Sequence, residues 1–267
     1  MRNPVGALLS CREPSCQEPS CRELLTLWEC GSALHAIDRA LLILGVVYPQ
    51  MSGQDLAALP IGERNVRLLK ICHQLFNPSV ECLIHCPGCR EMLEFQLDVA
   101  ALCPPDHVLA TGHEKHISHG DLHIRYRLIN SDDLAELIHC RDKEKARDAL
   151  IRRCLVEVEQ CGKPLQIDSL PDPCITEPVI EALEAHMQAW DPYANIFLNL
   201  DCPYCNTPWR EPFDIVDFLW KEIVIQAKRL MQEIGSLARH YGWSENDILS
   251  MSLWRRRVYL QRLEVGG

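Results

Sequence analysis

The sequence lacks a hydrophobic run long enough to cross a membrane. Its longest apolar stretch, residues 40–47, reads ALLILGVV, whereas a membrane helix needs about 20 such residues. The first residues, MRNPVGALLSC, also lack the longer apolar segment that marks a secretory signal. These two absences predict a cytoplasmic protein with no membrane segment.

The chain also has fewer basic than acidic residues. The chain has 27 Lys and Arg residues against 37 Asp and Glu residues, a formal net charge of −10. Because an acidic protein repels phosphate backbones, nucleic acid is not the expected partner. The basic run 255–257 is typical of a solvated helix face. Apolar residues, by contrast, make up 47% of the 267 residues, which excludes a disordered chain and allows one large core or two small ones.

The sequence contains none of the motifs GxGxxG, GxxxxGK[ST], HExxH or GxSxG, each of which is typical of an enzyme site. We therefore predict a protein that is not an enzyme. The histidines of residues 107–123 are the main alternative, as a metal or proton-transfer site, although a solvated polar hairpin explains them more simply. These histidines are His107, His113, His116, His119 and His123.

The chain is predicted to have three parts. Residues 1–22 form a flexible Cys/Pro-rich tail, because the near-repeat CREPS-CQEPS places proline at every fifth position and excludes a helix. Residues 23–242 form a helical domain that contains a split zinc ribbon, and residues 243–267 form a C-terminal helical module.

Apolar residues at helical spacing predict helices over 24–28, 36–47, 62–76, 131–139, 143–160, 178–190 and 214–240. Ser131 and Ser244 are the expected N-caps of the helices that follow them.

Two CPxC pairs stand out among the 15 cysteines: Cys86 with Cys89, and Cys202 with Cys205. Without an export signal the cysteines are expected to be reduced, so closely spaced pairs indicate a metal site before a disulfide. Each pair lies between two short apolar segments that end in Phe and Asp, SVECLIHCPGCREMLEFQLDV and NIFLNLDCPYCNTPWREPFDI. This pattern predicts two similar hairpins, each with a cysteine knuckle at its tip.

Zinc binds four ligands in a tetrahedron, and two residues between cysteines let both thiolates face one ion at about 2.3 Å. The two knuckles together offer four thiolates, so they predict one structural Zn²⁺ site in a ribbon interrupted by the 112 residues 90–201. Two alternatives remain open. A single CxxC can be a redox motif at a helix N-terminus, and Cys82 and His85 could join the first knuckle in a local site.

The predicted fold class is α+β. Helices lie at both ends of the chain, and a small antiparallel zinc-ribbon sheet with an inserted hairpin and helical region lies between them. A second hairpin is expected over 108–118 and 122–129, with its turn at 119–121.

Several segments of the chain resemble one protein family. They are LLTLWECG, AIDRALLIL, LAALPIGERNVRLL, CPGCREMLEFQLDV, YRLINSDDLAEL, CPYC with WREPFDIVDFLWKEI, and HYGWSENDILSMSLWRRRVYLQRL. Together they span about residues 24–264 and resemble the baseplate hub assembly chaperones of T4-like phages. Relatives of these chaperones are encoded in gene clusters for phage tail-like contractile injection systems.

The resemblance implies a cytoplasmic, non-enzymatic assembly chaperone or baseplate component that acts through protein–protein interaction. The implied partners are baseplate or hub proteins of a contractile tail-like particle. The four cysteines of the two knuckles match the family pattern residue by residue, whereas Cys11, Cys16 and Cys21 lie outside it. The alternative is a zinc-ribbon regulatory or nucleic-acid-binding adaptor, which would need a basic face to hold phosphate.

Overall fold

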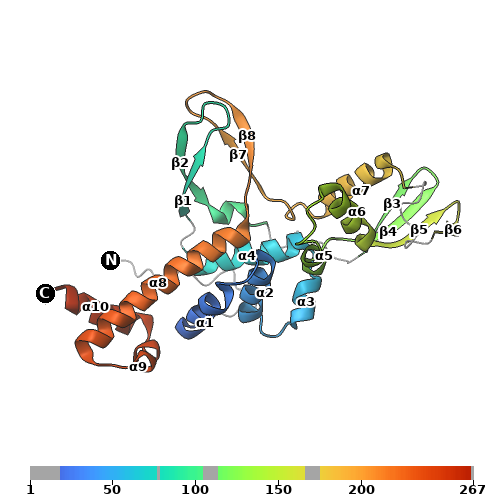
Figure 1. The fold of residues 1–267 in the computed structure, drawn as a ribbon. Coiled ribbons are helices and arrows are strands. Elements are labelled where there is room, and N and C mark those ends of the chain that lie inside the picture. Colours follow the sequence, from blue (N-terminus) through green and yellow to red (C-terminus); the bar gives the residue numbers. More distant parts are fainter. Residues whose placement is uncertain (1–18, 77–78, 105–113, 166–174, 266–267) are drawn as a thin grey trace. The chain divides into compact units, whose positions relative to one another are not determined.

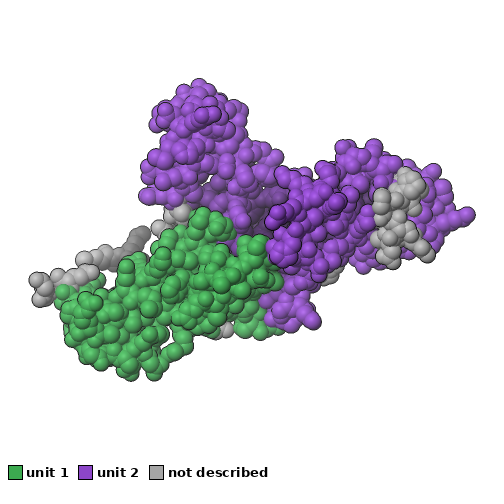
Figure 2. Space-filling view, in the orientation of Figure 1, with its two compact units in different colours: residues 1–50, 217–267 green, residues 51–216 purple. Residues whose placement is uncertain are grey.

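A computed structural model of the chain describes residues 19–76, 79–104, 114–165 and 175–265. It is a mixed helical and antiparallel structure, so the predicted α+β class is confirmed. The chain divides into two compact units, residues 1–50 with 217–267, and residues 51–216 (Figure 2). The predicted module 243–267 belongs to the first unit, and its independence from the helices there remains a prediction. Within the described residues, no helix combines the length and apolarity needed to cross a membrane.

The first unit is built from helices. They are α1 (Cys21–Gly31), α2 (Ala36–Val47), most of α8 (Ile215–Tyr241), α9 (Glu245–Leu249) and α10 (Leu253–Val265) (Figure 1). Ser20 caps α1 in a reciprocal capping box with Glu23, and Ser244 caps α9 in the same way with Asp247, as expected. Apolar residues three and four apart on α8 face the core of this unit. This core contains Leu25, Ala227, Leu230, Ile234, Leu237 and Ile248.

The second unit contains the two knuckle hairpins and a larger sheet (Figure 1). Its first elements are α3 (Gly53–Ala58), α4 (Ile61–Leu75), β1 (Ser79–His85), β2 (Met92–Asp98) and the 3-10 helix η2 (Val99–Leu102). The sheet region follows, with β3 (Glu114–His119), β4 (Leu122–Arg127), α5 (Ser131–Glu136), α6 (Lys143–Cys154), β5 (Leu155–Gln160), β6 (Lys163–Pro164) and α7 (Glu177–Trp190). The second knuckle hairpin, β7 (Phe197–Asp201) and β8 (Pro208–Pro212), completes the unit.

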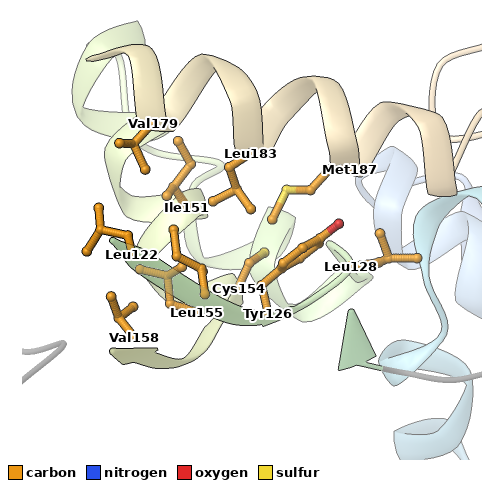
Figure 3. Close-up of a cluster of buried hydrophobic side chains, with 11 residues drawn as sticks. Leu122, Tyr126, Leu128, Ile151, Cys154, Leu155, Val158, Val179, Leu183 and Met187 are labelled. Atoms are coloured by element: carbon orange, nitrogen blue, oxygen red, sulfur yellow. The ribbon is translucent and has the colours of Figure 1, made fainter. Parts of the chain in front are cut away.

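The larger sheet is antiparallel in the order β3-β4-β5-β6, and α6 and α7 supply the apolar side chains that cover one of its faces. Figure 3 shows this core, in which α7 runs across side chains from β4 and β5. Tyr126 is fully buried there, and burial raises the pKa of its hydroxyl to about 12. Burial likewise raises the pKa of the Cys154 thiol to about 12, so this cysteine packs as a small apolar residue.

The structure corrects two local predictions and adds one helix. The helix predicted over 143–160 ends at Cys154, and residues 155–160 form a strand paired with β4. These residues read LVEVEQ, an alternation typical of a strand that the helical interpretation overlooked. The N-cap of α5 is Asn130 rather than Ser131. Helix α3 was not predicted.

Candidate metal centre

The two knuckles have the same backbone geometry. In the first, the amide of Cys86 donates to the carbonyl of Glu91 (3.0 Å), and the amide of Arg90 donates back to the carbonyl of Cys86 (2.9 Å). Each strand of the hairpin therefore ends at the turn that carries the thiols. Arg90, which directly follows Cys89, has a positive φ of 64°, a conformation that few non-glycine residues adopt.

The second knuckle repeats these contacts. The amide of Cys202 donates to the carbonyl of Thr207 (3.1 Å), and the amide of Asn206 donates to the carbonyl of Cys202 (2.9 Å). Asn206 directly follows Cys205 and has a φ of 56°. The same hydrogen bonds and the same left-handed residue therefore occur at equivalent positions of two segments far apart in the chain.

The four cysteine side chains converge. All four Sγ atoms lie within 4.8 Å of one another. The Sγ of Cys86 is 3.6 Å from that of Cys205, and the Sγ of Cys89 is 3.6 Å from that of Cys202. Four sulfurs around one ion at about 2.3 Å in a tetrahedron lie about 3.8 Å apart. The observed spacing therefore fits a single metal ion bound by both knuckles.

The centre combines buried and accessible ligands. Cys86 and Cys202 are each 1% exposed and pack with Leu93, whereas Cys205 is exposed. The partly buried side chains around them are Ile84, Cys89 and Trp209. This apolar surrounding excludes water from one side of the cluster, which strengthens the electrostatic attraction between thiolates and a cation.

Hydrogen bonding gives the thiols different acidities in the absence of metal. The hydroxyl of Thr207 lies 3.1 Å from the Sγ of Cys205, favours its thiolate, and lowers its pKa to about 6. At Cys89 the backbone N–H of Glu91 favours the thiolate, but desolvation and the neighbouring thiols outweigh it and raise the pKa to about 12. A metal ion that binds all four sulfurs as thiolates releases the protons that they carry.

A buried polar network joins α4 to the segment that connects α7 with the second knuckle hairpin. The carboxylate of Asp191 accepts a hydrogen bond from the amide of Gly62 (3.0 Å), and the amide of Asn65 donates to the carbonyl of Tyr193 (2.9 Å). Arg64, 6% exposed, donates to the Asn65 side chain. This network therefore fixes the segment that leads from α7 into β7. These residues were not predicted from the sequence, although polar side chains on the buried face of the predicted helix 62–76 were a usable signal.

The other residues considered from the sequence do not join the cluster. Among the described residues, the four cysteines are the group of metal-ligating side chains that lies close enough to hold an ion, and it includes neither Cys82 nor His85. The ring of His85 instead lies 3.3 Å from the carbonyl of Arg90. Both knuckles lie between strands, whereas a redox CxxC is typical of a helix N-terminus.

The histidines of the β3–β4 hairpin lie on exposed positions. His116, His119 and His123 are all exposed, and His123 Nδ1 lies 2.8 Å from the hydroxyl of Ser118. His107 and His113 fall outside the described residues.

On strand β5, which neighbours this hairpin, Glu157 and Glu159 share a face of the sheet, whereas a helix over 143–160 would turn them apart. Glu157 accepts hydrogen bonds from Arg125. This face is therefore a solvated polar surface within the described part of the chain.

Comparison with known proteins yields no matching family, no similar curated protein and no similar solved structure. The fold and the cysteine cluster therefore rest on the geometry described above.

Proposed function

We propose that the four cysteines bind one structural Zn²⁺. The convergence of two CPxC knuckles on one point carries this proposal, because four thiolates at tetrahedral spacing are the donor set that structural zinc prefers. Four protein ligands leave no open position for water or substrate. When bound, the ion supplies folding free energy by joining the two ends of the long insertion between the knuckles.

We further propose that the protein is a non-enzymatic assembly chaperone or component of the baseplate of a phage tail or contractile injection system, and that it acts in the cytoplasm. Two observations support this proposal. The segments of residues 24–264 resemble baseplate hub assembly chaperones, and the closed cysteine cluster is suited to holding a scaffold together rather than to catalysis. The net charge of −10 disfavours the alternative of a nucleic-acid-binding adaptor.

The proposal is tested by deleting the gene in the organism that encodes it. We expect sheath, tube and baseplate genes beside it, and we expect the deletion strain to lose assembled contractile particles in sedimentation and electron microscopy. Complementation with the wild-type gene should restore the particles, whereas a Cys202→Ser/Cys205→Ser variant should restore few. Normal particles in the deletion strain would contradict an assembly role.

The same experiment separates a transient chaperone from a retained component. Mass spectrometry of purified particles detects the chain at a fixed ratio to baseplate proteins if it is a component. A chaperone is absent from mature particles but co-purifies with a baseplate protein before assembly.

A further inference from the structure

The outward face of α10 exposes a large apolar surface between arginines. Trp254 is 75% exposed and Leu253 is 49% exposed. Arg257, one turn after them on the helix, is also exposed, as is Arg255. Large side chains this exposed are enriched at protein contacts, and a tryptophan beside arginine is the composition of a binding hot spot.

The outer face of the β1–β2 hairpin has the complementary composition. Leu83 is 65% exposed and Met92 is 60% exposed. Glu94 pairs directly with Leu83, and His85 pairs with Met92, so the two apolar side chains are diagonal neighbours on one face. Glu81, also exposed, lies on the same face two residues before Leu83. The hairpin thus presents two apolar side chains flanked by carboxylates.

The charge balance also differs between the two parts of the chain that carry these faces. Residues 217–267 contain eight Lys and Arg against six Asp and Glu, whereas residues 1–216 contain 19 against 31. A phosphate backbone would complement the arginines of α10 but would be repelled by the rest of the chain and would leave Leu253 without an apolar partner. A second copy of this chain supplies both the carboxylates and the apolar side chains.

We propose that this protein self-associates by docking the α10 face of one copy (Leu253, Trp254, Arg255 and Arg257) on the β1–β2 face of another (Glu81, Leu83, Met92 and Glu94). Because the two faces are different, the contact is heterologous, and each bound copy keeps one free face for a further copy. Opposite charges fix the register, and the apolar side chains supply most of the affinity. The proposal is independent of the baseplate assignment and of the metal's identity.

The test is the mass of the purified full-length, metal-loaded protein as a function of concentration, measured by analytical ultracentrifugation. We expect the mass to rise above that of one chain and the association to weaken at about 0.5 M salt. Trp254→Ala should raise the concentration needed for half-association at least about tenfold. Ile225→Ala is the matched control, because Ile225 is a 55% exposed apolar residue on α8, and it should change nothing. A single-chain mass at every concentration, or association that Trp254→Ala leaves intact, would overturn the proposal.

Charge reversal identifies the two faces. Arg257→Glu and Glu94→Arg should each weaken association, whereas an equimolar mixture of the two variants should recover it, because each variant then meets an opposite charge. A contact within one chain cannot recover on mixing. Lys228→Glu, an equal charge change at an exposed position of α8, should behave like the wild type. Failure of the mixture to recover would exclude the pairing of these two faces, and a foreign acidic partner in place of a second copy would leave the protein alone monomeric.

Discussion

Gly88 of the first knuckle lies directly against Thr207 of the second. A Cβ atom on Gly88 would lie 2.7 Å from the Thr207 hydroxyl oxygen and 3.4 Å from the Sγ of Cys205. The Gly88 amide also donates to the Sγ of Cys86 (3.3 Å). The absence of a side chain at residue 88 therefore lets the two knuckles approach closely enough for four sulfurs to meet. The two knuckles differ at this position, since the equivalent residue of the other knuckle, Tyr204, is 70% exposed.

Gly88→Ala should therefore weaken metal binding. The added methyl group would clash with the Thr207 side chain, so either Thr207 or the knuckles must shift. Overpacking of this kind costs about 1–3 kcal/mol, which corresponds to roughly a 5- to 100-fold loss of affinity. Competition with a chromogenic chelator measures the change. Gly235→Ala is the control, because a Cβ there meets nothing within 4 Å, and this variant should bind metal like the wild type. Unchanged affinity of Gly88→Ala would mean that the knuckles do not meet as described.

The metal content of the purified protein should be about one zinc per chain. Elemental analysis measures it, and Cys202→Ser/Cys205→Ser should abolish it, because one knuckle alone offers only two ligands. Cys140→Ser/Cys161→Ser is the matched control, since both of these cysteines are exposed and lie outside the cluster. Zinc that persists in the first variant would disprove a shared site.

The sequence predicts the knuckles well because their signal is local. A CPxC pair between two apolar segments specifies a hairpin with both thiols at its tip, and the structure has strands on both sides of each pair. Helix α2 was predicted with the bounds Ala36–Val47 that the structure shows, because Pro49 limits its end. These features depend on residues close together in the chain.

The sequence does not predict features that arise from distant contacts. Residues 155–160 follow α6 directly, with no proline or glycine to mark the boundary, and pairing with β4 fixes as a strand what their short alternation only indicates. The close approach of Gly88 and Thr207, and the hydrogen bond from the Gly62 amide to Asp191, each join segments more than 100 residues apart. Tertiary contacts decide each of these outcomes.

Asp133 should make the second unit sensitive to acid. Its side chain is fully buried, and it accepts hydrogen bonds from Arg127 (2.6 and 2.8 Å) and Arg153 (2.9 Å). Burial alone would raise its pKa, but hydrogen bonds from Arg127, the backbone of Asn130 and Arg153 lower it below the ordinary value. A carboxyl group with a lowered pKa in the folded state stabilises the fold above the pKa of the unfolded state. This contribution is lost as the pH falls through the folded-state pKa.

Asp133→Asn should therefore reduce the free energy of unfolding at pH 7 by about 3 kcal/mol, because it leaves two arginines without their buried partner. The difference from the wild type should begin to shrink as the pH falls below about 4, the ordinary pKa of the carboxyl group in the unfolded chain, and it should be lost as the pH falls through the lower folded-state pKa. Urea denaturation followed by circular dichroism measures both values. Asp148→Asn, an exposed acidic position on α6, serves as the control and should change stability by less than about 0.5 kcal/mol. A difference that stays constant with pH would refute this account.

The histidines of the β3–β4 hairpin should have no catalytic role. His116 and His119 are exposed on strand β3 and do not converge on the cysteine cluster. A His116→Ala/His119→Ala variant should fold like the wild type by circular dichroism. Any hydrolase or transferase activity in the preparation should be the same for both proteins. An activity that this variant loses while it remains folded would contradict a non-enzymatic protein.

Deletion of residues 243–267 should damage the first unit and spare the metal centre. Trp243 stacks on Tyr241 of α8 with ring centroids 4.4 Å apart, and Arg256, 2% exposed, donates to Glu233 of α8 (2.9 Å). The deletion removes these contacts together with the buried Ile248, so α8 would expose apolar surface, and the free energy of unfolding of this unit should fall by several kcal/mol. The four cysteines belong to the other unit, so the zinc content should remain about one per chain. Binding to a baseplate protein should be lost if the C-terminal residues form the contact.

The point variant Arg256→Met separates these effects. It keeps the length of α10 and its exposed residues but removes the buried ion pair with Glu233, so it should lower stability without removing the outward face of the helix. We expect this variant to bind the same baseplate protein at a temperature where it is folded, and the truncated chain to fail even there. Binding is measured by co-purification with the baseplate protein, and unfolding by circular dichroism. A truncated chain that still binds would place the contact elsewhere, and a truncated chain that loses its zinc would show that the two units depend on each other for folding.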